Sequence, residues 1–476
     1  MQKNSRQKKK ACPTSAATPR RREAPKAPSG PSARPRFNKV ESRSTKKINN
    51  YFLWPRGRRG LTQEESSSGA RPKKKHVNFY LGQATSFLRS ANNKLSELIS
   101  ALPPKFNKVF LILLASFLSV VIFINREKFA PDYIGAYISD VFAERQHGGG
   151  YPYKISGNKV SSENFKNIDK SLLLLSDTTL AALNTSASMM QKEQHSFPSP
   201  MLRVSGTRAI IYDLGGKHLK IKSKSKTLLS AEMENNIISA AVSNAGIFGV
   251  VTEVNNFLGQ LTIFAKNGKD VYYKYNFADH YITDMAISEN GKSATVCGST
   301  AKNGSMVSSV YVFDYRSETP KVKLDYEDNM FIRVEYLSNG NVVAVGDHLV
   351  TVINPRTGEK HDYNYENKTL IHFDVNKNGG ILLALSLSED GNNTDMVVIN
   401  KSGKVENVIH TEHNVKAVNF SHRKLAALSY GKVYVYNFSG NHLKTVDVGN
   451  DAKNIRLYSG RDMYVLGVTE VRKIRI

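Results

Sequence analysis

The chain has 476 residues and a net charge of +26, from 67 Lys and Arg against 41 Asp and Glu, which excludes a single evenly charged globule. The first 108 residues hold 26 of the basic residues and only 5 of the acidic ones, so binding to an acidic partner concerns that segment alone. Two cysteines, Cys12 and Cys297, lie on opposite sides of the apolar run at residues 109–124, so they cannot form a disulfide within the chain if that run spans a membrane.

Residues 1–78 are predicted to be a disordered, basic cytoplasmic tail. They hold few large apolar residues, so they cannot bury enough surface to offset the entropy of ordering. Clusters such as Lys8-Lys9-Lys10 and Arg20-Arg21-Arg22 predict contact with anionic lipid headgroups. Nucleic-acid binding is the competing interpretation, but aromatic residues accompany the basic clusters only around Trp54 and no recognition fold is present. We therefore expect no nucleic-acid partner.

An amphipathic juxtamembrane helix is predicted over residues 79–104. Apolar residues from Tyr80 to Leu102 recur at helical spacing, and Pro103-Pro104 ends the pattern. Such a helix could lie in the cytoplasmic membrane interface or pack against a partner helix, and the sequence does not separate the two arrangements.

A single transmembrane helix is predicted over residues 105–128. The run from Val109 to Ile124 is apolar or small throughout, and it lacks the polar face that a helix of a soluble protein normally keeps. It starts too late in the chain for a cleavable signal peptide, so we interpret it as an uncleaved signal anchor. The basic flank before it predicts a single-pass protein of the cell membrane, with a cytoplasmic N-terminus and an extracellular C-terminal domain.

After a predicted spacer at residues 129–150, residues 151–476 repeat a unit of four short strands about every 40 to 47 residues. One copy begins at Ile282 and turns at Asn290-Gly291, and the next begins at Phe331 and turns at Asn339-Gly340. A single four-stranded sheet cannot bury its own faces, so the units must stack around an axis as blades of a β-propeller. A β-sandwich also uses short strands, but it does not require self-similarity at this interval.

The predicted fold class is therefore all-β, an extracytoplasmic β-propeller with eight blades as the best count and seven if the weak first unit is misassigned. The last unit has only three strands. The segment Tyr153-Lys154-Ile155-Ser156 can supply its fourth strand and close the ring, which would leave no exposed edge. The predicted units start near Val160, Pro200, Asn236, Ile282, Phe331, Ile371 and Val415, followed by the incomplete one.

Several segments resemble those of one family. The sequences YPYKISG, SLLLLSDTTLAALNTS, GTRAIIYDLGGKHLKI and DHYITDMAISENGKSATV, with the basic tail and the anchor, are similar to an uncharacterised family of membrane-anchored Gram-positive bacterial proteins with a WD40- or PQQ-like propeller. The resemblance covers roughly residues 110–476 and implies a propeller outside the cell membrane, with no activity to transfer. The only tryptophan is Trp54, outside the repeats, so the Trp-Asp pairs of WD40 blades and the docking tryptophans of quinone enzymes are missing. We expect no cofactor.

The sequence contains no Gly-x-Ser-x-Gly elbow, Walker loop or His-Glu-x-x-His motif, and we predict no catalytic, cofactor-binding or metal-binding residues. His410 and His413 come nearest to a metal-ligand pair, but their loop setting favours a solvated turn. Asp284, Asp314 and Asp374 lie on or just after strands, where an Asp more often bonds a neighbouring turn than acts as an acid or base.

These features predict a non-enzymatic binding or scaffolding platform that is anchored in the membrane and engages an unknown protein or cell-envelope partner. The alternative is an exported enzyme, a hydrolase or lyase acting on cell-surface glycans, with its active site at the propeller channel. Three or more Asp, Glu or His side chains converging at one mouth of the channel would favour the enzyme. A third possibility, a cytoplasmic nucleic-acid tether, rests on the basic tail alone.

Overall fold

The computed structural model describes residues 104–124, 131–157, 159–387 and 392–476. The predicted tail at residues 1–78 and all but the last residue of the predicted juxtamembrane helix lie outside the described residues. Two helices precede the strands, α2 (Pro104–Ile124) and α3 (Pro131–Glu144). Neither helix, over the residues described, combines the length and the apolar character that crossing a membrane requires. The transmembrane segment at residues 105–128 stays a prediction.

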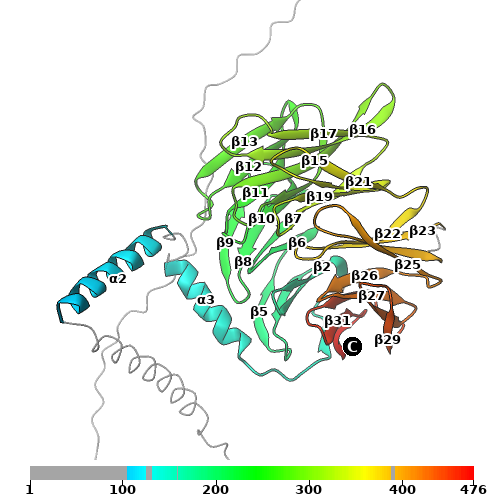
Figure 1. Cartoon of the computed structure of the whole chain (residues 1–476), viewed down its shortest axis with the longest axis horizontal. Helices are drawn as coiled ribbons and strands as arrows, with labels where there is room; N and C mark the ends of the chain where they lie inside the picture. The colour runs from blue at the N-terminus through cyan, green and yellow to red at the C-terminus, as the bar shows by residue number, and fades with distance from the viewer. Residues whose placement is uncertain (1–103, 125–130, 158, 388–391) are drawn as a thin grey trace, which may run out of the picture. The chain divides into compact units, whose positions relative to one another are not determined.

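The strands form eight four-stranded antiparallel sheets, the blades of a propeller (Figure 1). The first four blades are β2 (Val160–Ile168) to β5 (Met189–Gln194), with β3 (Ser171–Ser176) and β4 (Thr179–Leu183) between them; β6 (Pro200–Ser205), β7 (Arg208–Asp213), β8 (His218–Lys222) and β9 (Thr227–Glu232); β10 (Ile237–Val242), β11 (Phe248–Val254), β12 (Phe257–Phe264) and β13 (Val271–Phe277); and β14 (Tyr281–Ile287), β15 (Ser293–Lys302), β16 (Ser305–Asp314) and β17 (Val322–Glu327).

Blades 5 to 8 continue in the same order. They comprise β18 (Phe331–Tyr336), β19 (Val342–Gly346), β20 (Leu349–Ile353) and β21 (Lys360–Asn364); β22 (Thr369–Asn376), β23 (Gly380–Ser386), β24 (Thr394–Ile399) and β25 (Val405–Thr411); β26 (Ala417–Ser421), β27 (Lys424–Ser429), β28 (Lys432–Asn437) and β29 (His442–Asp447); and β30 (Asn454–Leu457), β31 (Asp462–Leu466) and β32 (Glu470–Arg475), with β1 (Tyr153–Lys154) as the fourth strand. The predicted eight-bladed propeller is confirmed.

The ring closes where the first strand joins the last blade. β1 pairs antiparallel with β32, with Tyr153 opposite Val471 and Lys154 opposite Glu470. The N–H group of Ile155 also donates to the carbonyl of Thr469 at 2.9 Å. The predicted completion of the last unit by this N-terminal segment is correct, and it removes the free edge that an open blade would expose.

The core is divided into apolar layers, each shared by two neighbouring blades. Tyr212 of blade 2 packs in one layer with Phe248 of blade 3, and Phe165 of blade 1 packs with Val471 of blade 8. The middle strands are mostly buried, and β3 is buried along its whole length, whereas an outermost strand such as β29 is mostly exposed. Burial of each large apolar side chain contributes about 1.5 to 3 kcal/mol, so the stacking of blades is what stabilises the ring.

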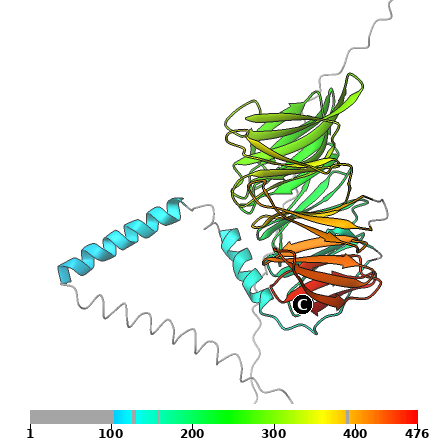
Figure 2. The ribbon, with the colours of Figure 1, turned by 45° about the vertical axis from the view of Figure 1, so that its right-hand side comes forward.

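Helix α3 docks on the turns of blades 1 and 2 (Figure 2). The carboxylate of Asp140 accepts hydrogen bonds from the Ser223 hydroxyl (3.0 Å) and the Ser225 N–H group (2.8 Å), and Glu144 forms an ion pair with Lys224. The amide of Asn184 donates to the Gln146 carbonyl at 2.7 Å, just beyond the helix. These contacts fix where the chain enters the propeller.

The close approach of the chain after α3 requires a glycine. The N–H group of Gly148 donates to the Ser186 hydroxyl at 3.1 Å, and a Cβ at position 148 would lie 2.2 Å from the Ser188 nitrogen. Because strand direction alternates within each blade, the turns between first and second strands and between third and fourth strands lie on the same side as α3. We call this side the α3 face and the other side the opposite face.

A charged contact between blades 1 and 2 makes stability depend on pH. Glu193 of β5 accepts hydrogen bonds from Lys220 at 2.5 Å and Thr227 at 2.9 Å, and it forms an ion pair with the fully buried Lys222 of β8. Burial opposes ionisation of Glu193, but the two lysines outweigh it and lower its pKa from 4.5 to about 2. A carboxyl whose pKa falls on folding stabilises the native state above pH 4.5, and this contribution is lost as the pH drops toward 2.

We therefore expect Glu193→Gln to lower the free energy of unfolding by about 1 to 2 kcal/mol at pH 7, less than the pKa shift alone would give, because solvent partly screens the exposed part of Glu193. The difference from the wild type should stay constant between pH 8 and 6 and narrow below about pH 4.5, as measured by urea unfolding at a series of pH values. Glu289→Gln, in an exposed turn of blade 4, is the matched control and should show no such narrowing. A difference that grew on acidification would contradict the assignment.

Candidate functional site

A cavity of about 500 Å³ lies on the propeller axis. The first strand of every blade contributes to its lining, from β2 of blade 1 to β30 of blade 8. Four of these strands, β10, β14, β18 and β22, carry a β-bulge near their start. A bulge redirects the side chains that follow it. The residues directly after the bulges are Ser239, Asp284, Arg333 and His372.

Asp284 joins four blades. Its carboxylate accepts hydrogen bonds from Arg203 of blade 2 (2.6 Å), Ser239 of blade 3 (3.2 Å) and the Val334 N–H group of blade 5 (3.0 Å). The residue is 1% exposed, so the ion pair with Arg203 is shielded from water. Burial alone would lower the pKa of Arg203, but the Asp284 carboxylate outweighs it and raises that pKa.

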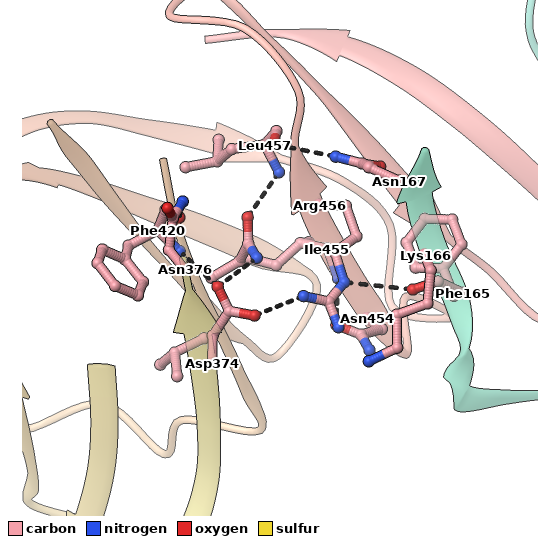
Figure 3. Close-up of polar contacts among 12 residues, drawn as sticks. Phe165, Lys166, Asn167, Asp374, Asn376, Phe420, Asn454, Ile455, Arg456 and Leu457 are labelled. Atoms are coloured by element: carbon pink, nitrogen blue, oxygen red, sulfur yellow. Dashed lines mark hydrogen bonds and ion pairs between the residues drawn. The ribbon is translucent and has the colours of Figure 1, made fainter. Parts of the chain in front are cut away.

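Asp374 plays the corresponding part in blade 6, and Figure 3 shows its contact with Arg456. Its carboxylate accepts from Arg456 of blade 8 at 2.5 Å, and from the Asn419 amide at 2.8 Å and the Phe420 N–H group at 3.2 Å, both in blade 7. The amide oxygen of Asn419 in turn accepts from the Leu457 N–H group of blade 8 at 2.7 Å. Each Asp therefore bonds an arginine two blades away and the backbone of the next blade.

Two contacts cross the cavity between opposite blades. Arg333 of blade 5 forms an ion pair with Glu163 of blade 1, and the Lys377 ammonium of blade 6 donates to the Ser205 hydroxyl of blade 2 at 3.2 Å. Burial opposes ionisation of Glu163, but the charges of Lys166, Arg203 and Arg456 together lower its pKa. The Glu163 carboxylate is ionised at neutral pH and balanced by the cations around it.

His372 is held as a neutral imidazole at pH 7. Burial lowers its pKa to about 4, and the charge of Arg456 adds to this effect. Its Nδ1 accepts a hydrogen bond from the Val418 N–H group at 3.3 Å. A group with so low a pKa is a weak base near neutrality, and this reduces its value for proton transfer.

More than three acidic or imidazole side chains line the cavity, so the criterion given above for an enzyme is met. They are Glu163, Asp169, Glu335, His372 and Asp374. Their environment fits glycoside hydrolysis poorly. That reaction needs one carboxylic acid that stays protonated, with a raised pKa, beside a second carboxylate. Here the pKa of Glu163 is lowered, and the Asp374 carboxylate is occupied by Arg456 and Asn419.

Some buried polar atoms of the residues that line the cavity lack a hydrogen-bond partner within the part of the chain that the structure describes. They include the Nε–H groups of Arg203 and Arg333, the Tyr336 hydroxyl and the Asn167 amide oxygen. Three of these four can donate a hydrogen bond. Because these atoms are themselves buried, they do not identify a ligand site at the axis.

A serine and a histidine that sequence reasoning missed lie together in blade 4. Ser309 Oγ is 2.8 Å from His280 Nε2 and donates to Asp325 at 2.5 Å, while His280 Nδ1 is 2.9 Å from the Tyr311 hydroxyl. In a hydrolytic triad the carboxylate orients the imidazole, whereas here it binds the serine. Ser309 and His280 are buried and do not line the cavity, so they form a structural hydrogen-bond network.

Comparison with known proteins decides the family. Residues 151–476 match the model of a family of unknown function, DUF5711. The chain belongs to the DUF5711 family. The resemblance to a propeller family without an established activity, which was inferred from the sequence, is thus confirmed. No curated protein matches the chain.

Solved structures share the fold of the DUF5711 propeller at low identity. The C-terminal WD40 domain of Sif2 is 12% identical, with 69% of this chain and 99% of that chain covered and a TM-score of 0.50. Sqt1 of Saccharomyces cerevisiae is 12% identical over 69% of this chain and 100% of its own, with a TM-score of 0.48. BamB of Moraxella catarrhalis is 10% identical, with 68% of this chain and 99% of that chain covered and a TM-score of 0.44. Of these three, the Sif2 domain alone reaches a TM-score of 0.50, and its likeness concerns the fold alone.

The remaining residues singled out in the sequence lie apart from the cavity of the DUF5711 propeller. Asp314 pairs with Arg316 at 2.7 Å in an exposed turn. His410 lies 2.6 Å from Asp395, and the ring of His413 stacks on another aromatic ring, so the two histidines do not converge. No group of three or more His, Cys, Asp or Glu residues is placed to hold a metal ion, as far as the described residues go.

Cys297 is buried beside Asp284, while Cys12 lies outside the described residues. Burial, and then the Asp284 charge, raise the pKa of the Cys297 thiol to about 12. A thiol that is both buried and protonated reacts slowly with added reagents. This property makes introduced cysteines in the DUF5711 propeller selectively addressable.

Proposed function

We propose that this chain is a non-enzymatic binding or scaffolding platform, a propeller anchored in the cell membrane that holds its ring outside the cell. The observation that carries the proposal is the use of the axial charges to join blades. Asp284 and Asp374 each bond an arginine and the backbone of a neighbouring blade, and Glu163 pairs with Arg333 across the axis. Charges used in this way give a rigid ring that presents broad turn surfaces.

The anchor rests on the sequence of α2 and its neighbours. The run from Val109 to Ile124 is uninterrupted by charge, and large apolar side chains on it are exposed, with Ile112 68% and Phe117 66% exposed. Contiguous exposed apolar surface of this kind calls for a lipid or protein environment. The strongly basic segment before α2 favours a cytoplasmic N-terminus.

Cysteine labelling on intact cells tests the compartment. In Lys217→Cys, on an exposed turn of blade 2 on the opposite face, the thiol is expected to react with a membrane-impermeant maleimide without permeabilisation. Buried Cys297 should give little background, and Cys12 should react only after permeabilisation, which makes it the internal control. Labelling at position 217 that required permeabilisation would refute the external location.

Photocrosslinking tests the platform. A photoreactive residue at Asp279, exposed on the opposite face, is expected to capture a recurrent partner in cells that express the full chain. The same residue at Tyr212, which is 1% exposed within the core, is the control and should give no adduct. Adducts absent from Asp279 and from further exposed sites on that face would count against a binding role.

An exported enzyme acting on cell-surface glycans is the second candidate, because one cavity carboxylate is not committed to a contact. Glu335 lines the cavity and has no hydrogen-bond or ion-pair partner among the described residues. Release of soluble sugar from cell-envelope glycans by the wild type, lost in Glu335→Gln, would favour the enzyme over the platform.

A further inference from the structure

The turns on the two faces of the propeller differ in charge. On the α3 face the turns between strands hold 14 Lys and Arg against 5 Asp and Glu. On the opposite face the described turns hold 5 Lys and Arg against 8 Asp and Glu. The basic excess of the domain is therefore concentrated on the face at which the chain enters the ring.

Many of the basic residues on the α3 face are free to meet a surface. Lys269, Lys292, Arg356, Lys404 and Arg423 are exposed and come from blades 3 to 7. These residues span five of the eight blades, so the positive charge is spread over much of the face. A planar anionic surface matches such a distribution better than a single small anion does.

Helix α3 adds an apolar element to the same face. Ala136 and Ala143 are buried, while Tyr137, Ile138 and Phe142 are 68%, 48% and 67% exposed. The helix therefore turns its small residues inward and leaves its large ones uncovered. Aromatic and aliphatic side chains beside basic residues are typical of the membrane interface, and here the basic residues come from the turns, because α3 itself holds no Lys or Arg.

The connection to α2 is short. Only six residues separate Ile124, the end of α2, from Pro131, the start of α3. A fully extended link of this length spans at most about 25 Å. If α2 anchors the chain as proposed above, α3 and its face cannot lie far from the bilayer.

We propose that the α3 face rests on the anionic lipid surface of the membrane, with Tyr137, Ile138 and Phe142 in the interface and the basic turns against the headgroups. This inference rests on the proposed membrane anchor and adds an orientation to it. The acidic opposite face then points away from the membrane and is the surface left for a partner.

Fluorescence quenching on the full chain tests the orientation. Single cysteines at Phe142→Cys, Lys292→Cys and Asp279→Cys, each combined with Cys12→Ser, carry a fluorophore in vesicles that contain nitroxide-headgroup lipid. In vesicles of equal parts phosphatidylglycerol and phosphatidylcholine, quenching at positions 142 and 292 should exceed quenching at position 279 at least about twofold. In phosphatidylcholine alone, or at high salt, quenching at position 292 should fall toward the value at position 279.

Charge reversal provides the matched control. Arg356→Glu with Lys404→Glu, on the α3 face, should reduce quenching at position 292 in the anionic vesicles. Lys217→Glu with Lys416→Glu, on the opposite face, changes the net charge equally and should leave that quenching unchanged. Equal effects of the two pairs would overturn the proposal, and they would point to a response to net charge alone.

The outcomes separate the orientation from the anchor. A chain that alkaline carbonate strips from the vesicles refutes the anchor, whatever the quenching shows. A carbonate-resistant chain with equal quenching at positions 142 and 279 refutes the orientation alone. The proposal is also overturned if quenching at position 142 is strong but changes neither with lipid charge nor with the charge reversals. In that case α3 alone would contact the membrane, and the basic turns would not.

Discussion

Asp284→Asn is expected to lower the free energy of unfolding by about 3 to 5 kcal/mol, because it leaves the Arg203 guanidinium largely buried without its counter-charge. The carboxylate also accepts from Ser239 and from the Val334 backbone, so contacts of three further blades weaken together. An Asn can satisfy part of this set, but it cannot offer two charged oxygens. The loss should appear as a lower urea midpoint with an unchanged slope.

Asp314→Asn is the matched control for this prediction. Asp314 also pairs with an arginine, at 2.7 Å, but Arg316 is almost fully exposed and the pair lies in a turn. Exposed ion pairs contribute about 0 to 1 kcal/mol, so the variant should unfold close to the wild type. If the two variants lost similar amounts of stability, the Asp284 contact would stabilise the fold no more than an exposed ion pair does.

Ending the chain at Gly467, which removes β32, is expected to cost about 5 kcal/mol or more and to abolish a single cooperative unfolding transition. The deletion removes Val471, which is fully buried between blades 8 and 1, and all of the ladder hydrogen bonds that β32 makes with β31 and β1. β1 would then have no partner, and the ring would open at the junction of its two ends.

Urea unfolding and limited proteolysis measure this effect. Cleavage of the shortened chain should begin within blades 1 and 8 and at lower protease concentration than in the wild type. Removing Ile476 alone, a residue beyond the end of β32, is the control and should leave the transition cooperative. A shortened chain that unfolded like the wild type would show that the ring does not depend on this closure.

The blade count and the closure could be predicted because each blade repeats its own local signals. Turns such as Asn290-Gly291 and Asn339-Gly340 recur at one place in the unit, and Gly291 and Gly340 adopt the positive φ that such turns need. Buried middle strands read as continuous apolar runs, while the outermost strands are polar. Because the last unit has only three strands, a fourth was predicted from the segment just ahead of the first unit.

The composition of the axial cavity could not be predicted in the same way. Arg333 and Glu163 are 170 residues apart, and nothing in either local sequence indicates that blades 1 and 5 face each other across the axis. For Asp284 and Asp374 a neighbouring turn was expected as the partner, whereas the structure gives each an arginine two blades away. A polar residue directly after the bulge of several first strands is the one signal that could have indicated this layer.

The pairing of Tyr153 with Val471 has a consequence for synthesis. The ribosome makes Tyr153, in the outermost strand of blade 8, more than 300 residues before Val471, in the strand next to it, so blade 8 cannot be completed until β32 has been synthesised. Throughout translation the growing chain keeps an unpaired strand at each end of the arc. Chaperones that shield such edges would matter most until β32 is made, and a chain terminated before β32 would leave the ring open.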